Sequence, residues 1–189
     1  MGRVEEILEF WFGCGDGSDR QEMWFSAGRA FDQACSAGFR ADYERAARGA
    51  LDDWMNEPSS ALALILLLDQ FPRNMFRGTA RAFATDSKAL AIAKRMVAAK
   101  LDHAVTPSRR AFVYMPFQHS ENLSDQHESM RLFRELAEEH SELADYLKYA
   151  ERHLEVIARF GRFPHRNAML GRASTPQESE FLSSGGESF

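Results

Sequence analysis

The sequence predicts an all-α protein, and three observations support this prediction. Counts of residue types give 26 Ala against 13 for Val, Ile and Thr together. Ala is the best helix former, whereas the β-branched residues favour strands. No stretch alternates apolar and polar residues cleanly enough for a half-buried strand, and several prolines follow capping residues, as they do where helices begin. We therefore expect about nine short helices, stacked as antiparallel pairs.

Prolines and capping residues indicate where these helices begin and end. Thr175–Glu178 and Ser18–Gln21 read as capping boxes, each at the start of a helix. Pro72, Pro116 and Pro164 are expected to end helices, because the residue before a proline disfavours the helical region. The expected helices span residues 3–12, 19–35, 39–55, 58–70, 80–99, 107–115, 122–139, 142–160 and 175–182.

Apolar patterning suggests how the helices are buried. Helix 58–70 is apolar almost all round, so we expect it at the centre with neighbours on every side. On helix 142–160, His153 lies at one edge of the apolar stripe and is expected at the border between core and solvent. Residues 1–182 are expected to form one domain, followed by a flexible C-terminal tail over 183–189.

Composition excludes several classes of protein. The longest apolar run, Ala61–Leu68, is far shorter than a membrane-spanning helix. Glu5 and Glu9 argue against a signal peptide, and Cys14 and Cys35 form neither a disulfide framework nor a metal-binding spacing. The net charge of −5 argues against nucleic acid as the main partner. We expect a cytoplasmic protein with no cofactor, metal, nucleic-acid or membrane partner, and leave its oligomeric state open.

A Phe-Pro-Arg-Asn motif occurs twice, at Phe71–Asn74 and, with one His inserted, at Phe163–Asn167. Helix termination explains the first copy, because Arg complements the helix dipole and Asn can cap the next helix. The second copy lies in a run of 14 residues, Arg159–Arg172, that contains four Arg. Such a cluster repels itself unless carboxylates or an anionic ligand lie between the guanidinium groups. An anion-binding cleft is therefore the functional interpretation of this copy.

The candidate site residues follow from this cleft. In the first hypothesis a small anionic metabolite, carrying phosphate or carboxylate, binds where both motifs meet the His119–Glu121 segment. His119 or His165 would act as acid or base, oriented by Glu121 or Asp69, so the catalytic candidates are His119, Glu121 and His165. The candidate ligand-binding residues are Asp69, Arg73, Asn74, His153, Arg162, Arg166, Asn167 and Arg172.

A second hypothesis stays open. The chain would be a helical-repeat interaction module, without catalysis, whose groove binds an acidic peptide or partner protein. Convergence of the two motifs and His119 into one closed pocket favours the small ligand, whereas an open groove favours the peptide. The sequence contains no metal-binding His-Glu-x-x-His motif and no serine nucleophile elbow. Whether the protein is an enzyme is therefore undecided at this point.

Four segments together resemble a known bacterial family, the domain of unknown function 924. They are Leu66–Asn74, Ala82–Ala84, Pro116–Glu121 and Arg159–Arg172, and the likeness extends from about Ile7 to Leu182. The resemblance implies an all-α, tetratricopeptide-like fold. It implies no activity, because the family is named for lacking one.

Overall fold

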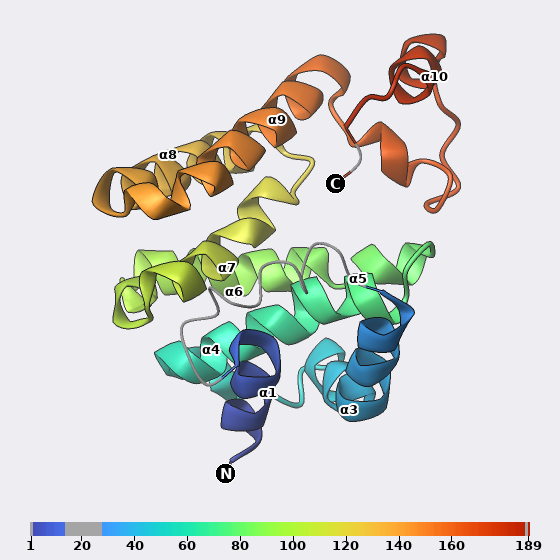
Figure 1. Ribbon diagram of the computed structural model, residues 1–189. Coiled ribbons are helices and arrows are strands. Elements are labelled where there is room, and N and C mark those ends of the chain that lie inside the picture. Colours follow the sequence, from blue (N-terminus) through green and yellow to red (C-terminus); the bar gives the residue numbers. More distant parts are fainter. Residues whose placement is uncertain (1, 14–27, 188) are drawn as a thin grey trace. The chain divides into compact units, whose positions relative to one another are not determined.

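The computed structural model describes residues 2–13, 28–187 and 189, and all regular secondary structure within these residues is helical (Figure 1). The prediction of an all-α fold is therefore confirmed. The chain divides into two compact units, which we describe separately. The first unit comprises Met1–Arg77 and Arg81–Pro116, and the second comprises Gly78–Ala80 and Phe117–Phe189. The expectation of a single domain over 1–182 with a flexible tail stays a prediction.

The first unit is built around α4 (Pro58–Ile65). Residues Ala61–Leu68 are completely buried, which confirms the central position expected from their apolar character. α4 packs against α1 and α6, and aromatic side chains fill the space around them, with Phe71 lying 5.1 Å from Trp11 between ring centroids. Among the residues described, the α-helices of this unit are α1 (Arg3–Phe12), α3 (Arg29–Ala47), α4, α5 (Phe71–Met75), α6 (Asp86–Ala98) and α7 (Pro107–Gln118) as far as Pro116.

Several expected helix boundaries in this unit are wrong. α3 runs without interruption through residues 36–38, where a break between two helices was expected. The glycine in this stretch, Gly38, does not break the helix, because a single glycine costs a helix only about 1 kcal/mol. The buried side chains Cys35, Phe39 and Tyr43 follow at four-residue spacing across that point and hold the helix together. The expected helix 39–55 ends at Ala47 and is followed by the 3-10 helix Asp52–Asn56. The expected helix 80–99 is divided into the 3-10 helix Ala80–Phe83 and α6. The capping box Ser18–Gln21 and residues 19–27 lie outside the described residues.

Pro72 does not end a helix, contrary to expectation. The helical path continues from α4 through a π-helical turn, Leu66–Gln70, into α5, where Pro72 occupies the first turn. Proline has no N–H to donate to the carbonyl four residues earlier, that of Leu68. The buried Thr85 hydroxyl donates to this carbonyl at 2.6 Å instead. Pro116 likewise lies inside α7, which ends two residues later at Gln118.

The second unit is organised by an antiparallel pair, α8 (Leu123–Glu139) and α9 (Ala144–Phe160), which pack along each other (Figure 1). α9 ends at Gly161, whose positive φ of 68° suits glycine, so the helix end expected before Pro164 is confirmed. α10 (Pro176–Ser183) begins with the expected capping box of Thr175 and Glu178. No helix of the described residues is both long and apolar enough to cross a membrane.

Candidate functional site

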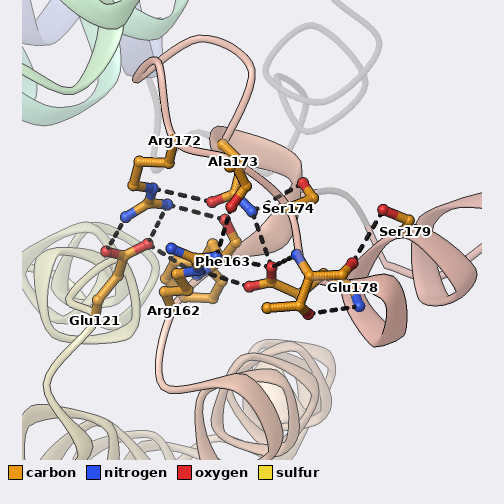
Figure 2. Close-up of polar contacts among 10 residues, drawn as sticks. Glu121, Arg162, Phe163, Arg172, Ala173, Ser174, Glu178 and Ser179 are labelled. Carbon is orange, nitrogen blue, oxygen red and sulfur yellow. Dashed lines mark hydrogen bonds and ion pairs between the residues drawn. The ribbon is translucent and has the colours of Figure 1, made fainter.

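An ion pair joins the second Phe-Pro-Arg-Asn motif to the start of α8. Both terminal nitrogens of Arg172 donate to the carboxylate of Glu121, at 2.7 and 2.9 Å, although the two residues are 51 positions apart (Figure 2). The backbone N–H of Phe163 donates to the same carboxylate at 2.8 Å. A bidentate pair of this kind holds both groups in one geometry. Glu121 thus fixes the turn after α9 against the junction of α7 and α8.

A second ion pair joins the same motif to α10. Arg162 donates to both oxygens of Glu178, at 2.6 and 2.8 Å, and to the carbonyl of Ala173 at 2.9 Å (Figure 2). Asn167 links the two pairs, because its Nδ2 donates to Glu178 at 3.3 Å and its Oδ1 accepts from Arg172 at 2.9 Å. Arg162, Asn167 and Arg172 are therefore parts of one connected polar network.

The protonation of the two carboxylates follows from these contacts. Burial alone raises the pKa of Glu121, but hydrogen bonds from Arg172 and Phe163, with the charges of Arg172 and Arg166, outweigh it and lower the pKa. The hydrogen bond from Arg162 is the main reason that the pKa of Glu178 falls to about 2. Both groups are anions at neutral pH. The repulsion between arginines noted in the sequence is therefore balanced at Arg162 and Arg172 by the protein's own carboxylates.

Arg166 has different surroundings from these two arginines. Its side chain is buried, with 5% of its surface exposed, and its Nη1 donates to the backbone carbonyl of His119 at 3.1 Å. The guanidinium lies 4.5 Å from the ring centroid of Phe163, a cation–π distance. Arg159, by contrast, is exposed and lies over the rings of Phe160 and Phe181.

Two histidines pack on the same phenylalanine, and a third lies beside one of them. The ring centroid of His153 lies 5.6 Å from Phe163 and 6.0 Å from His119, and His165 lies 5.6 Å from Phe163. His153 is 3% exposed, so its expected place at the border of core and solvent is wrong. The aromatic side chains of Phe163 and Phe189 pack against it and exclude solvent.

The imidazole of His153 is neutral. Its Nδ1 lies 2.7 Å from the carbonyl of Tyr149 and donates to it, which leaves Nε2 as an acceptor. Within the described part of the chain, this buried Nε2 has no hydrogen-bond partner. Burial is the main cause that lowers the pKa of His153 to about 3, and electrostatic interactions with His119, Arg166 and His165 lower it further. The surroundings of His153 are therefore both dry and electropositive.

The first Phe-Pro-Arg-Asn motif has its own ion pairs within the first unit. Arg73 donates to both oxygens of Asp86 at 3.0 Å and lies 3.3 Å from the carboxylate of the fully buried Asp69. Asn74 donates to Asp32 at 2.9 Å. These contacts suit the structural interpretation of this copy. That the two motifs share one site stays a prediction.

Two further features help to define the site. A shallow depression of about 330 Å³ lies beside Arg162 and Glu178, and its lining includes none of the three histidines. In the described part of the chain, no three His, Cys, Asp or Glu side chains are grouped to hold a metal ion. We therefore take the candidate site as the cluster of His119, His153, His165 and Arg166 around Phe163, called the histidine–arginine cluster below.

Sequence reasoning missed two residues that shape this region. Glu178 was recognised only as part of a capping box, although its carboxylate also binds Arg162. Phe189, assigned to a flexible tail, stacks on His153. The one signal for it was an aromatic residue in an otherwise polar segment.

Comparison with known proteins identifies the family. Residues 7–186 match the family described as "Bacterial protein of unknown function (DUF924)". The chain belongs to this family. The solved structure of a protein of unknown function from Agrobacterium tumefaciens is similar, with 41% sequence identity and a TM-score of 0.87. The similarity covers 96% of this chain and 97% of that one. A search of curated proteins found no match.

Proposed function

We propose that the second unit of this DUF924 protein binds a small anionic ligand, carrying phosphate or carboxylate, at the histidine–arginine cluster. The observation that carries the proposal is that the buried guanidinium of Arg166 and two imidazoles pack on Phe163, with the imidazole of His119 beside that of His153. A buried cation is costly, and one held beside several titratable rings is more typical of a binding site than of an inert core.

The roles of the four residues differ. Arg166 brings a fixed positive charge, since a guanidinium stays protonated at any physiological pH. His119 and His165 contribute imidazole N–H groups that can donate hydrogen bonds to an anion. His153 stays neutral and contributes a buried acceptor, its Nε2, to a hydroxyl or N–H group of the ligand.

Arg162 and Arg172 are not part of the proposed binding group. Their bidentate pairs with Glu178 and Glu121 hold the turn on which Arg166 and His165 lie. A site held on such a network is organised before the ligand arrives, which reduces the entropic cost of binding. Arg73, Asp69 and Asn74, together with catalysis by His119, Glu121 or His165, remain predictions from the sequence.

The test is a thermal-shift screen of phosphorylated and carboxylated metabolites, followed by calorimetry on each hit. Arg166→Gln removes the charge while keeping a donor for the His119 carbonyl, and it should weaken a hit at least tenfold. Arg134→Gln, at an exposed position on α8, removes one charge from the same unit and should leave affinity unchanged.

Three results would count against the proposal. They are the absence of any hit, equal weakening by both substitutions, and binding of acidic peptides alone, which would favour an interaction module. If Arg166→Gln does not fold, His165→Asn replaces it. Histidine side-chain NMR on the parent protein gives an independent readout, because the ligand should shift the imidazole signals of His119 and His165.

A further inference from the structure

The side chain of Phe189 occupies a defined position in the second unit. Its ring stacks on the imidazole of His153 with 3.6 Å between centroids and an interplanar angle of 24°. The edge of the same ring meets Phe163 at 5.9 Å and His165 at 6.0 Å. Three aromatic side chains thus enclose one planar group, and two of them belong to the histidine–arginine cluster.

A glycine-containing turn connects α10 to this ring. Ser184–Gly186 contains two consecutive glycines; Gly185 has a positive φ of 82°, and the N–H of Gly186 donates to the carbonyl of Phe181 at 2.9 Å. Glycine has more backbone freedom than any other residue, so a change in this turn can release the ring from the histidine–arginine cluster while it stays tethered. The ion pair of Glu187 with Arg152 spans 3.5 Å between exposed side chains and adds little.

The surroundings of the ring combine two kinds of recognition. One face of the site is a neutral imidazole, which can stack on an aromatic ring without desolvating a charge. The buried guanidinium of Arg166 lies over Phe163, the same side chain that Phe189 meets edge-on. A place for a planar ring and a place for an anion therefore adjoin at one phenylalanine.

We infer that Phe189 occupies the subsite for an aromatic ring, and that the anionic ligand is an aryl phosphate or a similar ring-bearing anion. The inference rests on the proposed function and names the class of its ligand. Phe189 acts as a tethered competitor that the ring of the ligand displaces. The apparent affinity for the ligand is then the intrinsic affinity multiplied by the fraction of molecules in which the subsite is open.

Three probes separate ring recognition from anion recognition. Phenyl phosphate has both groups, cyclohexyl phosphate has a non-planar ring of similar size, and inorganic phosphate has no ring. Calorimetry measures each probe against the full chain, against Phe189→Ala and against Phe83→Ala. Phe83 is the control because it is also partly buried but packs on the cluster of Tyr43, Phe76 and Ala82 in the first unit.

We expect Phe189→Ala to bind phenyl phosphate at least tenfold more tightly than the full chain does. The affinities for cyclohexyl phosphate and inorganic phosphate should change less than twofold, and Phe83→Ala should behave as the full chain for all three probes. Equal gains for all three probes would show that Phe189 only blocks access, and would overturn the inference. Unchanged affinities would overturn it as well.

This experiment distinguishes a failure of the inference from a failure of the proposed function, because the two predict different binding results. Phosphate binding that depends on Arg166 but shows no preference for the phenyl ring contradicts the inference alone. Absence of binding of every probe to every variant contradicts the proposed function and this inference with it. If Phe189→Ala lowers the melting temperature, the comparison is made at a temperature at which this variant is still folded, as its own unfolding curve shows.

Discussion

The two Phe-Pro-Arg-Asn motifs have nearly the same residues and opposite structural roles. The first lies inside a helical path that continues through Pro72, and Arg73 forms an ion pair with Asp69, four residues earlier, and with Asp86. The second follows a true helix end at Gly161. The arginines on either side of it, Arg162 and Arg172, pair with carboxylates that are distant in sequence, 51 residues away in the case of Arg172 and Glu121.

The comparison shows that a proline need not end a helix when another group replaces its lost hydrogen bond. At Pro72 the Thr85 hydroxyl replaces the missing donor. At Pro164 the chain has already left α9 through a left-handed glycine three residues earlier. The first motif is consequently part of the helical core of the first unit, whereas the second is a turn after a helix end.

Loss of Arg73 should have the largest effect. Arg73→Ala leaves the fully buried Asp69 without this partner, and we expect the free energy of unfolding to fall by about 3 kcal/mol. Urea unfolding measures the change. Arg77→Ala is the matched control, because its pair with Asp32 is more exposed and should contribute less than about 1 kcal/mol. Equal losses would mean that the first motif is not held by buried charge.

Loss of Arg172 should have the second-largest effect on the free energy of unfolding. Glu121 and Arg172 retain some exposure, so Arg172→Ala should cost about 2 kcal/mol in the same assay. Adding Glu121→Gln should cost much less in this background than in the parent protein, because the two groups act as a pair. Strict additivity of the two changes would contradict the network described for the second motif.

His153 should make stability depend on pH. Its pKa is about 3 in the folded protein against 6.5 for the unperturbed group, so between these values the unfolded chain binds the extra proton. The contribution of the neutral His153 to the free energy of unfolding is fully present above about pH 6.5. The free energy of unfolding then falls as the pH decreases, by about 2 kcal/mol between pH 8 and pH 5. Urea unfolding at several pH values should show this loss.

A substitution assigns the pH effect to one histidine. His153→Leu should reduce the slope between pH 6.5 and pH 5, whereas His127→Leu, at an exposed position on α8, should leave it unchanged. An imidazole of His153 that titrates near pH 6.5 by NMR would contradict its buried, neutral state.

Loss of the Thr85 hydroxyl should have the smallest effect. Thr85→Val removes the donor to the Leu68 carbonyl and should cost about 1 kcal/mol, while Thr85→Ser keeps the donor and should cost less. Pro72→Ala restores an N–H near this carbonyl and should recover part of the loss in the Thr85→Val background. If Pro72→Ala has the same effect in both backgrounds, the hydroxyl is not what makes Pro72 tolerable.

Local signals in the sequence predicted much of the fold. The capping box at Thr175, the apolar run Ala61–Leu68 and the helix end before Pro164 are all present as expected. The failures at Gly38 and Pro72 have a common cause, since in each case contacts from elsewhere in the chain outweigh a local preference. Of the site, the sequence located the arginine-rich turn and its histidines, but it could not assign a partner to each arginine.

The sequence by itself determined that this chain is helical, which segments are buried, and that four arginines lie within one short segment. Those properties depend on residue type and on spacing along one element, and both can be read directly. Only the tertiary structure decided which groups each arginine contacts. Arg162 and Arg172 find Glu178 and Glu121, whereas Arg166 lies over Phe163 beside three histidines. The reason is physical, because the energy of a charge depends on what folding brings within a few ångströms of it, and sequence distance does not report that separation.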